Sequence, residues 1–214
     1  MKLKKNIKAP NFKLPSTNNS IFELNKIKKK NIILYFYPKD DTPGCTIESK
    51  DFSKLNSLIS KNNSIVLGIS KDSIESHLKF KKKYKLKFNL LSDEKLLIIK
   101  KYGVWGKKSF LGKKYMGIVR TTFLINAKGK IHKIWSNVRV KDHAKEVLEE
   151  LKNIWDLLFL TKIYKYKQNE RWMYMSEDHK MTAKDKLVYA ITLATIFFGV
   201  LGLGLIGVII NILS

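Results

Sequence analysis

The chain contains a single cysteine, Cys45, which follows a point where a strand gives way to a helix. The stretch YFYPKDDTPGCTIESK ends a run of β-formers at Pro38 and carries helix-start signals at Thr42 and Pro43. Thr is a good N-cap and Pro fits the first helical position, so Cys45 is expected in the first helical turn. Backbone N–H groups and the helix dipole favour an anion there. Because the thiolate is the reactive form of cysteine, this placement predicts a nucleophile.

Pro38, Thr42 and Cys45 match the P-x-x-x-T-x-x-C signature of peroxiredoxins. The chain resembles the bacterioferritin-comigratory-protein, or Q-type, branch of that family, and the similarity continues through VLGISKDSIESHLKF, LLSDE, YGVWG and YMGIVRTTFLI, over roughly residues 5 to 152. The resemblance implies a thioredoxin-like three-layer α/β sandwich. It also implies an antioxidant, thiol-dependent peroxidase that reduces hydrogen peroxide and organic hydroperoxides with no cofactor and no metal.

The resemblance further implies a role for each residue of the site. Cys45 is the peroxidatic cysteine, which attacks one peroxide oxygen and becomes sulfenic acid. Thr42 holds the peroxide through its hydroxyl, Arg120 stabilises the thiolate and the developing charge, and Pro38 shields the sulfur from water. The backbone N–H groups of Gly44 and Cys45 complete the substrate site. Because Lys is the usual cation of this chain, an Arg at position 120 also suggests planar, multidentate bonding.

Each of these residues also has a structural interpretation. A lone cysteine is often a small buried hydrophobe, Thr42 could serve only as a helix cap, and Arg120 could be a surface cation. Glu48 fits the C-T-x-E pattern of the branch but is also a favourable acid near a helix start. The four histidines show no metal-ligand spacing and are expected to be surface or packing residues: His77, His132, His143 and His179.

The chain departs from the family at position 50. Many members of the branch carry a resolving cysteine five residues after the peroxidatic one, and here that residue is Lys50. An intrachain disulfide cannot form, so the sequence predicts a one-cysteine mechanism in which an external thiol reduces the sulfenic acid. The candidates are thioredoxin, a glutaredoxin, glutathione, or Cys45 of a second chain. The protein is expected to be a monomer or a homodimer.

Alternating strands and helices are predicted over the first 154 residues. The apolar runs IILYFY and IVLGIS are typical of buried strands, and a turn at Ala127-Lys128-Gly129 joins the two strands of a hairpin. This order predicts a layered α/β sandwich. The expected strands are 32–37, 65–70, 121–126 and 130–136, and the expected helices are 45–60, 73–84, 94–102 and 142–153.

The chain is strongly basic, with 42 Lys and Arg residues against 18 Asp and Glu and a formal net charge of +24. Such a surface suits nucleic acid or an anionic membrane. Only three of the 42 cations are Arg, whereas the reading of base edges draws heavily on Arg geometry, so no specific nucleic-acid partner is expected. The net charge still leaves one alternative function, a catalytically idle basic scaffold that binds a membrane or nucleic acid.

The C-terminal region contains 27 residues without a charge, from Leu187 to Leu213. This length and composition predict a transmembrane helix. Lysines precede the span, and the positive-inside rule then leaves the preceding domain in the cytoplasm. The expected organisation is a peroxiredoxin domain over 1–154, a linker or interfacial segment over 155–186 and a membrane helix over 187–213, giving a single-pass, C-terminally anchored protein. A further alternative is a small membrane-complex subunit fused to a peroxiredoxin.

Overall fold

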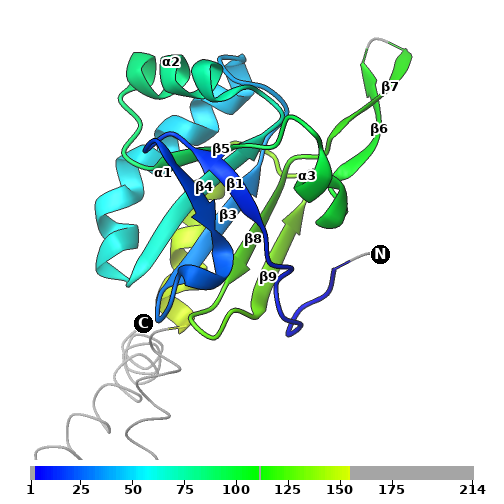
Figure 1. The fold of residues 1–214 in the computed structure, drawn as a ribbon. Helices are drawn as coiled ribbons and strands as arrows, with labels where there is room; N and C mark the ends of the chain where they lie inside the picture. Colours follow the sequence, from blue (N-terminus) through cyan, green and yellow to red (C-terminus); the bar gives the residue numbers. More distant parts are fainter. Residues whose placement is uncertain (1–2, 111, 155–214) are drawn as a thin grey trace, which may run out of the picture. The chain divides into compact units, whose positions relative to one another are not determined.

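A seven-stranded mixed sheet forms the centre of the computed structural model, which describes residues 3–110 and 112–154 (Figure 1). The strand order is β2-β1-β5-β4-β3-β8-β9, with a separate two-stranded ribbon of β6 and β7. The strands are β1 (Lys13–Ser16), β2 (Ser20–Glu23), β3 (Asn31–Phe36), β4 (Ser64–Ser70), β5 (Asn89–Ser92), β6 (Trp105–Phe110), β7 (Lys113–Ile118), β8 (Thr121–Ile125) and β9 (Ile131–Ser136). The helices are α1 (Pro43–Lys61), α2 (Ile74–Tyr84) and α3 (Leu97–Lys101), with a 3-10 turn η1 (Leu24–Lys26) and further helical residues at 143–154.

The middle of the sheet follows from its apolar strands. All six residues of β3 are buried, and this strand pairs in parallel with β4 and antiparallel with β8. A strand buried on both faces needs a continuous apolar run, which is what IILYF supplies. β4 in turn pairs in parallel with β5. The carboxyl ends of β3, β4 and β5 therefore lie along one edge of the sheet.

Helices cover both faces of this sheet, which makes three layers (Figure 1). One face packs against α1, α2 and the helical residues 143–154, through side chains such as Phe52, Phe80 and Val147. The other face packs against α3 and the N-terminal segment, through Ile99 and Phe12. Alternate residues of each central strand point into opposite layers. The thioredoxin-like α/β sandwich expected from the resemblance is confirmed.

The sequence located the helices and four strands of the main sheet, and it missed three strands of that sheet and both strands of the ribbon. The expected strands and helices correspond to β3, β4, β8, β9, α1, α2, α3 and the helical residues 143–154, with shifted ends. The strands β1, β2, β5, β6 and β7 were not anticipated. β1 and β2 have four residues each and are held by pairing with each other and with β5 rather than by an apolar run of their own. Lysines occupy several positions of the β6–β7 ribbon, which obscures any strand pattern.

The predicted linker over 155–186 and the predicted membrane helix over 187–213 lie outside the described residues. Over residues 3–110 and 112–154, no helix combines the length and the hydropathy needed to cross a membrane.

His143 fastens the last described helix to the sheet. Its Nε2 lies 2.8 Å from the hydroxyl oxygen of Thr122 on β8, and its ring meets Phe52 and Trp135 edge-on. Burial lowers the pKa of His143 to about 4, with a smaller opposing contribution from Glu146. The folded protein therefore keeps this imidazole neutral at a pH where the unfolded chain takes up a proton.

We expect His143→Gln to weaken the acid sensitivity of folding. The unfolded state protonates His143 near pH 6.5 and the folded state only near 4, so this residue lowers the free energy of unfolding as pH falls through that window, by about 3 kcal/mol in all. Denaturant titrations of both proteins between pH 7 and 4 measure the difference. Parallel pH profiles for the wild type and the variant would contradict the prediction.

Candidate active site

The sheet brings together residues that are far apart in sequence at the point where β3 ends and α1 begins. In the antiparallel register of β3 and β8, Phe36 pairs with Thr121. Arg120 directly precedes Thr121 and so lies beside the end of β3, 75 residues after Cys45 in the sequence. Because α1 starts seven residues beyond the end of β3, its first turn and Arg120 share this edge.

Cys45 lies in the first turn of α1, where the sequence placed it. Thr42 is the N-cap residue and Pro43 is the first helical residue. The first backbone bond of the helix runs from the Thr46 N–H to the Thr42 carbonyl, so the N–H groups of Gly44 and Cys45 have no acceptor inside the helix. A Cβ atom built on Gly44 would lie 3.5 Å from Nη2 of Arg120, which shows that this backbone borders the same space. The turn therefore offers N–H donors beside the sulfur.

Arg120 joins the sulfur to a second acidic group. Its Nη2 lies 3.2 Å from Sγ of Cys45, and its Nη1 donates to Oε2 of Glu48. Cys45 and Glu48 are each only 1% exposed. A guanidinium can donate in fixed directions to two acceptors at once, which an ammonium on a flexible stem cannot reproduce. The bonding expected for an Arg at this position is present, and Arg120 is not a free surface cation.

The charges of this trio are coupled. Burial raises the pKa of Glu48 to about 7, although Arg120 offsets part of that effect. Burial also opposes the charge of Arg120, but the neighbouring Glu48 and Cys45 outweigh it and the pKa of Arg120 is raised. One guanidinium cannot neutralise a carboxylate and a thiolate together. Protonation of Glu48 near neutral pH therefore relieves the excess negative charge that a thiolate beside it would create.

Thr42 uses its side chain differently from a helix cap. Its backbone occupies the N-cap position, but its hydroxyl makes no capping bond and instead donates to the carbonyl of Lys39, at 3.1 Å. The possibility that Thr42 is only a side-chain cap is therefore wrong. With its proton committed to Lys39, the oxygen of Thr42 keeps its lone pairs for a donor outside the loop.

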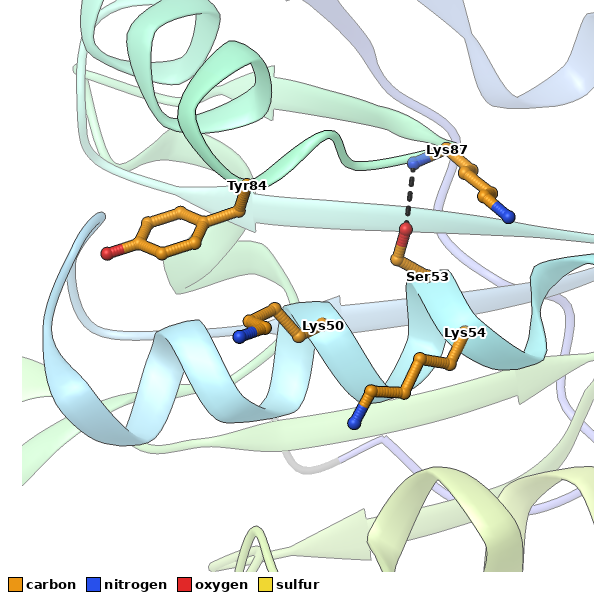
Figure 2. Close-up of a pocket in the computed structure, with 5 residues that line it drawn as sticks. All are labelled: Lys50, Ser53, Lys54, Tyr84 and Lys87. Carbon is orange, nitrogen blue, oxygen red and sulfur yellow. Dashed lines mark hydrogen bonds between the residues drawn. The ribbon is translucent and has the colours of Figure 1, made fainter.

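Pro38 and Lys50 occupy different surroundings. Pro38 is half-buried in the loop that joins β3 to α1. Lys50 is exposed, five residues after Cys45 on α1, and lines a separate pocket with Ser53, Lys54, Tyr84 and Lys87 (Figure 2). Nζ of Lys50 is 6.0 Å from the ring centroid of Tyr84. Position 50 therefore places a cation against the end of α2.

Three residues next to the site were missed from the sequence. Asp40 lies in the loop after β3, Asp72 lies in the segment after β4, and His77 lies on α2. His77 was expected to be a surface or packing residue; it is fully buried and contacts the Asp40 carboxylate. The position of Asp40 and Asp72 just beyond two buried strands could have indicated that they lie close together, because the carboxyl ends of parallel strands share one edge of the sheet.

Comparison with known proteins gives consistent results. Residues 6–134 match the family described as AhpC/TSA. The chain is 50% identical over 144 residues to a peroxiredoxin bcp of Coxiella burnetii, and 44% identical over 147 residues to peroxiredoxin Bcp of Bacillus subtilis. These matches cover 67% and 69% of this chain and 95% and 94% of the relatives.

A solved structure agrees with these relatives. It is that of the Xanthomonas campestris bacterioferritin comigratory protein, which was studied for alkyl peroxide reduction. The similarity has a TM-score of 0.63 at 35% identity and covers 66% of this chain and 90% of that one. The likeness in sequence thus extends to the fold.

These relatives correct the localisation predicted from the sequence. The match takes up 94% of the Bacillus subtilis protein, so its remainder is too short to hold a 27-residue span like the one predicted from Leu187 to Leu213. No helix within residues 3–110 and 112–154 of this chain can cross a membrane either. The prediction of a single-pass, C-terminally anchored membrane protein is therefore wrong.

We expect Arg120→Met to reduce the thiolate form of Cys45. Loss of a cation in contact with the sulfur removes a favourable interaction with its charged form, so a smaller fraction of Cys45 should be thiolate at neutral pH. The thiolate absorbance at 240 nm, measured against pH, follows this change. Arg120→Lys should restore only part of the effect, because one ammonium cannot replace both guanidinium bonds.

Arg139→Lys is the matched control, since Arg139 is exposed and follows β9. It should titrate like the wild type. An Arg120→Met protein with an unchanged absorbance profile would show that Arg120 does not stabilise the thiolate.

Proposed function

The chain belongs to the AhpC/TSA family, as a peroxiredoxin of the Bcp branch, and we infer the chemistry of its site from that premise. The protein is a thiol-dependent peroxidase, an oxidoreductase that reduces peroxides at the expense of thiols. We propose that Cys45 is its peroxidatic residue. The observation that carries this assignment is the 3.2 Å contact between Arg120 and the sulfur in the first turn of α1.

In the proposed first step the Cys45 thiolate attacks the terminal oxygen of a hydroperoxide. A sulfur–oxygen bond forms, the oxygen–oxygen bond breaks, and the alkoxide or hydroxide that leaves takes up a proton to become an alcohol or water. Sulfur is oxidised to sulfenic acid and the peroxide is reduced. Hydrogen peroxide and organic hydroperoxides both fit this scheme, because only the –OOH group takes part.

The neighbouring groups have complementary roles in this step. Arg120 and the N–H groups of Gly44 and Cys45 can donate to the peroxide oxygens as negative charge moves onto the leaving oxygen. Thr42 can accept a hydrogen bond from the peroxide hydroxyl, because its own proton is given to Lys39. Pro38 limits the access of water from the side of the loop. Glu48 holds Arg120 in its orientation and, when protonated, leaves the positive charge to the sulfur.

The second half of the proposed cycle uses an external thiol. A reductant thiol attacks the sulfenic acid and releases water, which leaves a mixed disulfide on Cys45. A second thiol then attacks that disulfide, regenerates the Cys45 thiolate and releases the oxidised reductant. Thioredoxin, a glutaredoxin and glutathione can each supply the two electrons, and Cys45 of a second copy of the chain is the remaining source of a thiol.

Two structural facts support an external reductant. Cys45 is the only cysteine of the chain, and position 50 holds an exposed lysine in the pocket of Figure 2. The catalytic unit is assigned to residues 1–154, and the monomeric or homodimeric state of the protein stays a prediction. An idle basic scaffold is disfavoured, because such a protein has no need for a buried thiol in contact with an arginine.

We expect Cys45→Ser to abolish peroxide consumption, and Lys50→Ser, in the exposed position five residues away, to leave it within about twofold of the wild type, as for most surface changes. Peroxide loss is followed in separate reactions with thioredoxin or glutathione as the reductant. After one equivalent of peroxide without reductant, mass spectrometry with a sulfenic-acid trap should find the adduct on Cys45 alone. Residual turnover in Cys45→Ser would refute the assignment of the nucleophile.

A further inference from the structure

A polar cluster of two buried residues and one half-buried residue holds the loop that precedes Cys45. It consists of Asp40, Asp72 and His77, which we call the loop anchor. The three residues come from the β3–α1 loop, the β4–α2 segment and α2, and they meet at the edge of the sheet where the parallel strands end. Asp40 is 7% exposed and His77 is fully buried.

The Asp40 carboxylate is held by three donors. Its Oδ1 accepts a bond from the Tyr37 hydroxyl at 2.7 Å, and its Oδ2 lies 2.7 Å from the Ser76 hydroxyl and 2.8 Å from Nδ1 of His77. The other ring nitrogen of His77 lies 3.2 Å from the carbonyl of Leu91. Both ring nitrogens of His77 thus lie within hydrogen-bond distance of an oxygen, and the imidazole is held from two sides.

A buried polar pair of this kind is weak support for stability, because desolvation of the two groups offsets much of their attraction. Its geometric effect is clearer, since Asp40 is fixed by bonds that come from three directions. Asp40 directly follows Lys39, whose carbonyl receives the Thr42 hydroxyl. The loop anchor therefore holds the residue next to the group that orients Thr42.

The backbone between Lys39 and Asp40 connects the loop anchor to Thr42. The Lys39 carbonyl and the Asp40 N–H belong to one planar peptide group. On one side of that peptide the N–H donates to Oδ2 of Asp72 at 2.7 Å, and on the other side the carbonyl accepts from Thr42 at 3.1 Å. Asp72 is itself fixed by the Ser70 hydroxyl at 2.7 Å. A carboxylate on the N–H side also polarises the peptide and makes its carbonyl a stronger acceptor.

We propose that Asp40, Asp72 and His77 are positioning residues of the peroxidase reaction, which orient the 39–40 peptide so that Thr42 presents its oxygen as an acceptor to the peroxide. This inference rests on the proposed function of Thr42 and Cys45. The loop anchor acts on the peroxide through Thr42 and leaves the Arg120 contact with the sulfur unchanged. It should therefore affect the binding of the peroxide hydroxyl and leave the thiolate itself unaffected.

The test compares two reactions of the same sulfur. Peroxide needs the Thr42 acceptor, whereas alkylation by iodoacetamide needs only an accessible thiolate. Asp72→Ala should lower the rate constant with hydrogen peroxide about tenfold, as expected for loss of a hydrogen bond to a charged group, with alkylation unchanged. Asp72→Asn keeps an acceptor without the charge and should fall between Asp72→Ala and the wild type. Asp142→Asn, at an exposed aspartate beyond β9, is the matched control and should behave as the wild type.

A double-variant cycle tests the route through Thr42. Thr42→Val should lower the peroxide rate by itself, and adding Asp72→Ala should cost little more, because the acceptor is already gone. Thr42→Ser should recover most of the rate. Full additivity of the two changes, an unchanged peroxide rate in Asp72→Ala, or an equal loss in alkylation would each overturn the positioning role.

His77 supplies a second variant set. An asparagine amide can replace the Nδ1 donor to Asp40, so His77→Asn should retain more peroxide activity than His77→Ala, at equal rates of alkylation. Equal peroxide rates in these two variants would count against the proposal. Other results would refute the proposed function itself. These are a Thr42→Val protein that reacts with peroxide like the wild type, or a Cys45→Ser protein that remains active.

Discussion

A sulfur that is almost fully buried can carry a negative charge only beside a cation, and Arg120 is the cation in contact with Cys45. The arrangement depends on the antiparallel register of β3 and β8, because only the pairing of Phe36 with Thr121 carries Arg120 to the start of α1. A shift of one residue would turn the side chain to the opposite face of the sheet. The buried strands that fix this register therefore also fix the chemistry of Cys45.

The same edge of the sheet supports the site from two sides. Arg120, just before β8, contacts the sulfur and Glu48 of α1. Asp72, just after β4, and His77 on α2 hold the β3–α1 loop. In the proposed mechanism, the first pair controls the charge on the sulfur and the second pair controls the orientation of the substrate. Separate elements therefore carry the two requirements of a peroxidase, an ionised sulfur and an oriented substrate, and a change in one need not disturb the other.

The sequence revealed the parts of the site that depend on local chemistry. Thr42, Pro43 and Cys45 follow one another in a recognisable helix start, and the family resemblance added Arg120 from a distant strand. Asp40 and His77 were not predicted, because 37 residues separate them and each has an ordinary solvent-exposed interpretation when taken alone. Three of the five missed strands have only four residues each, and lysines interrupt the pattern of the other two.

The two halves of the proposed cycle place opposite demands on the first turn of α1. The peroxide step needs an enclosed sulfur, and Cys45 is 1% exposed. The reductive step needs that sulfur to meet a thiol from another molecule, because the exposed side chain at position 50 is a lysine. Oxidation itself helps to reconcile these demands. A sulfenic acid is neutral, so it attracts Arg120 less than a thiolate does, while the Glu48 carboxyl still binds the same guanidinium. The contact that closes the first turn over the sulfur is therefore strongest before the reaction with peroxide and weaker after it.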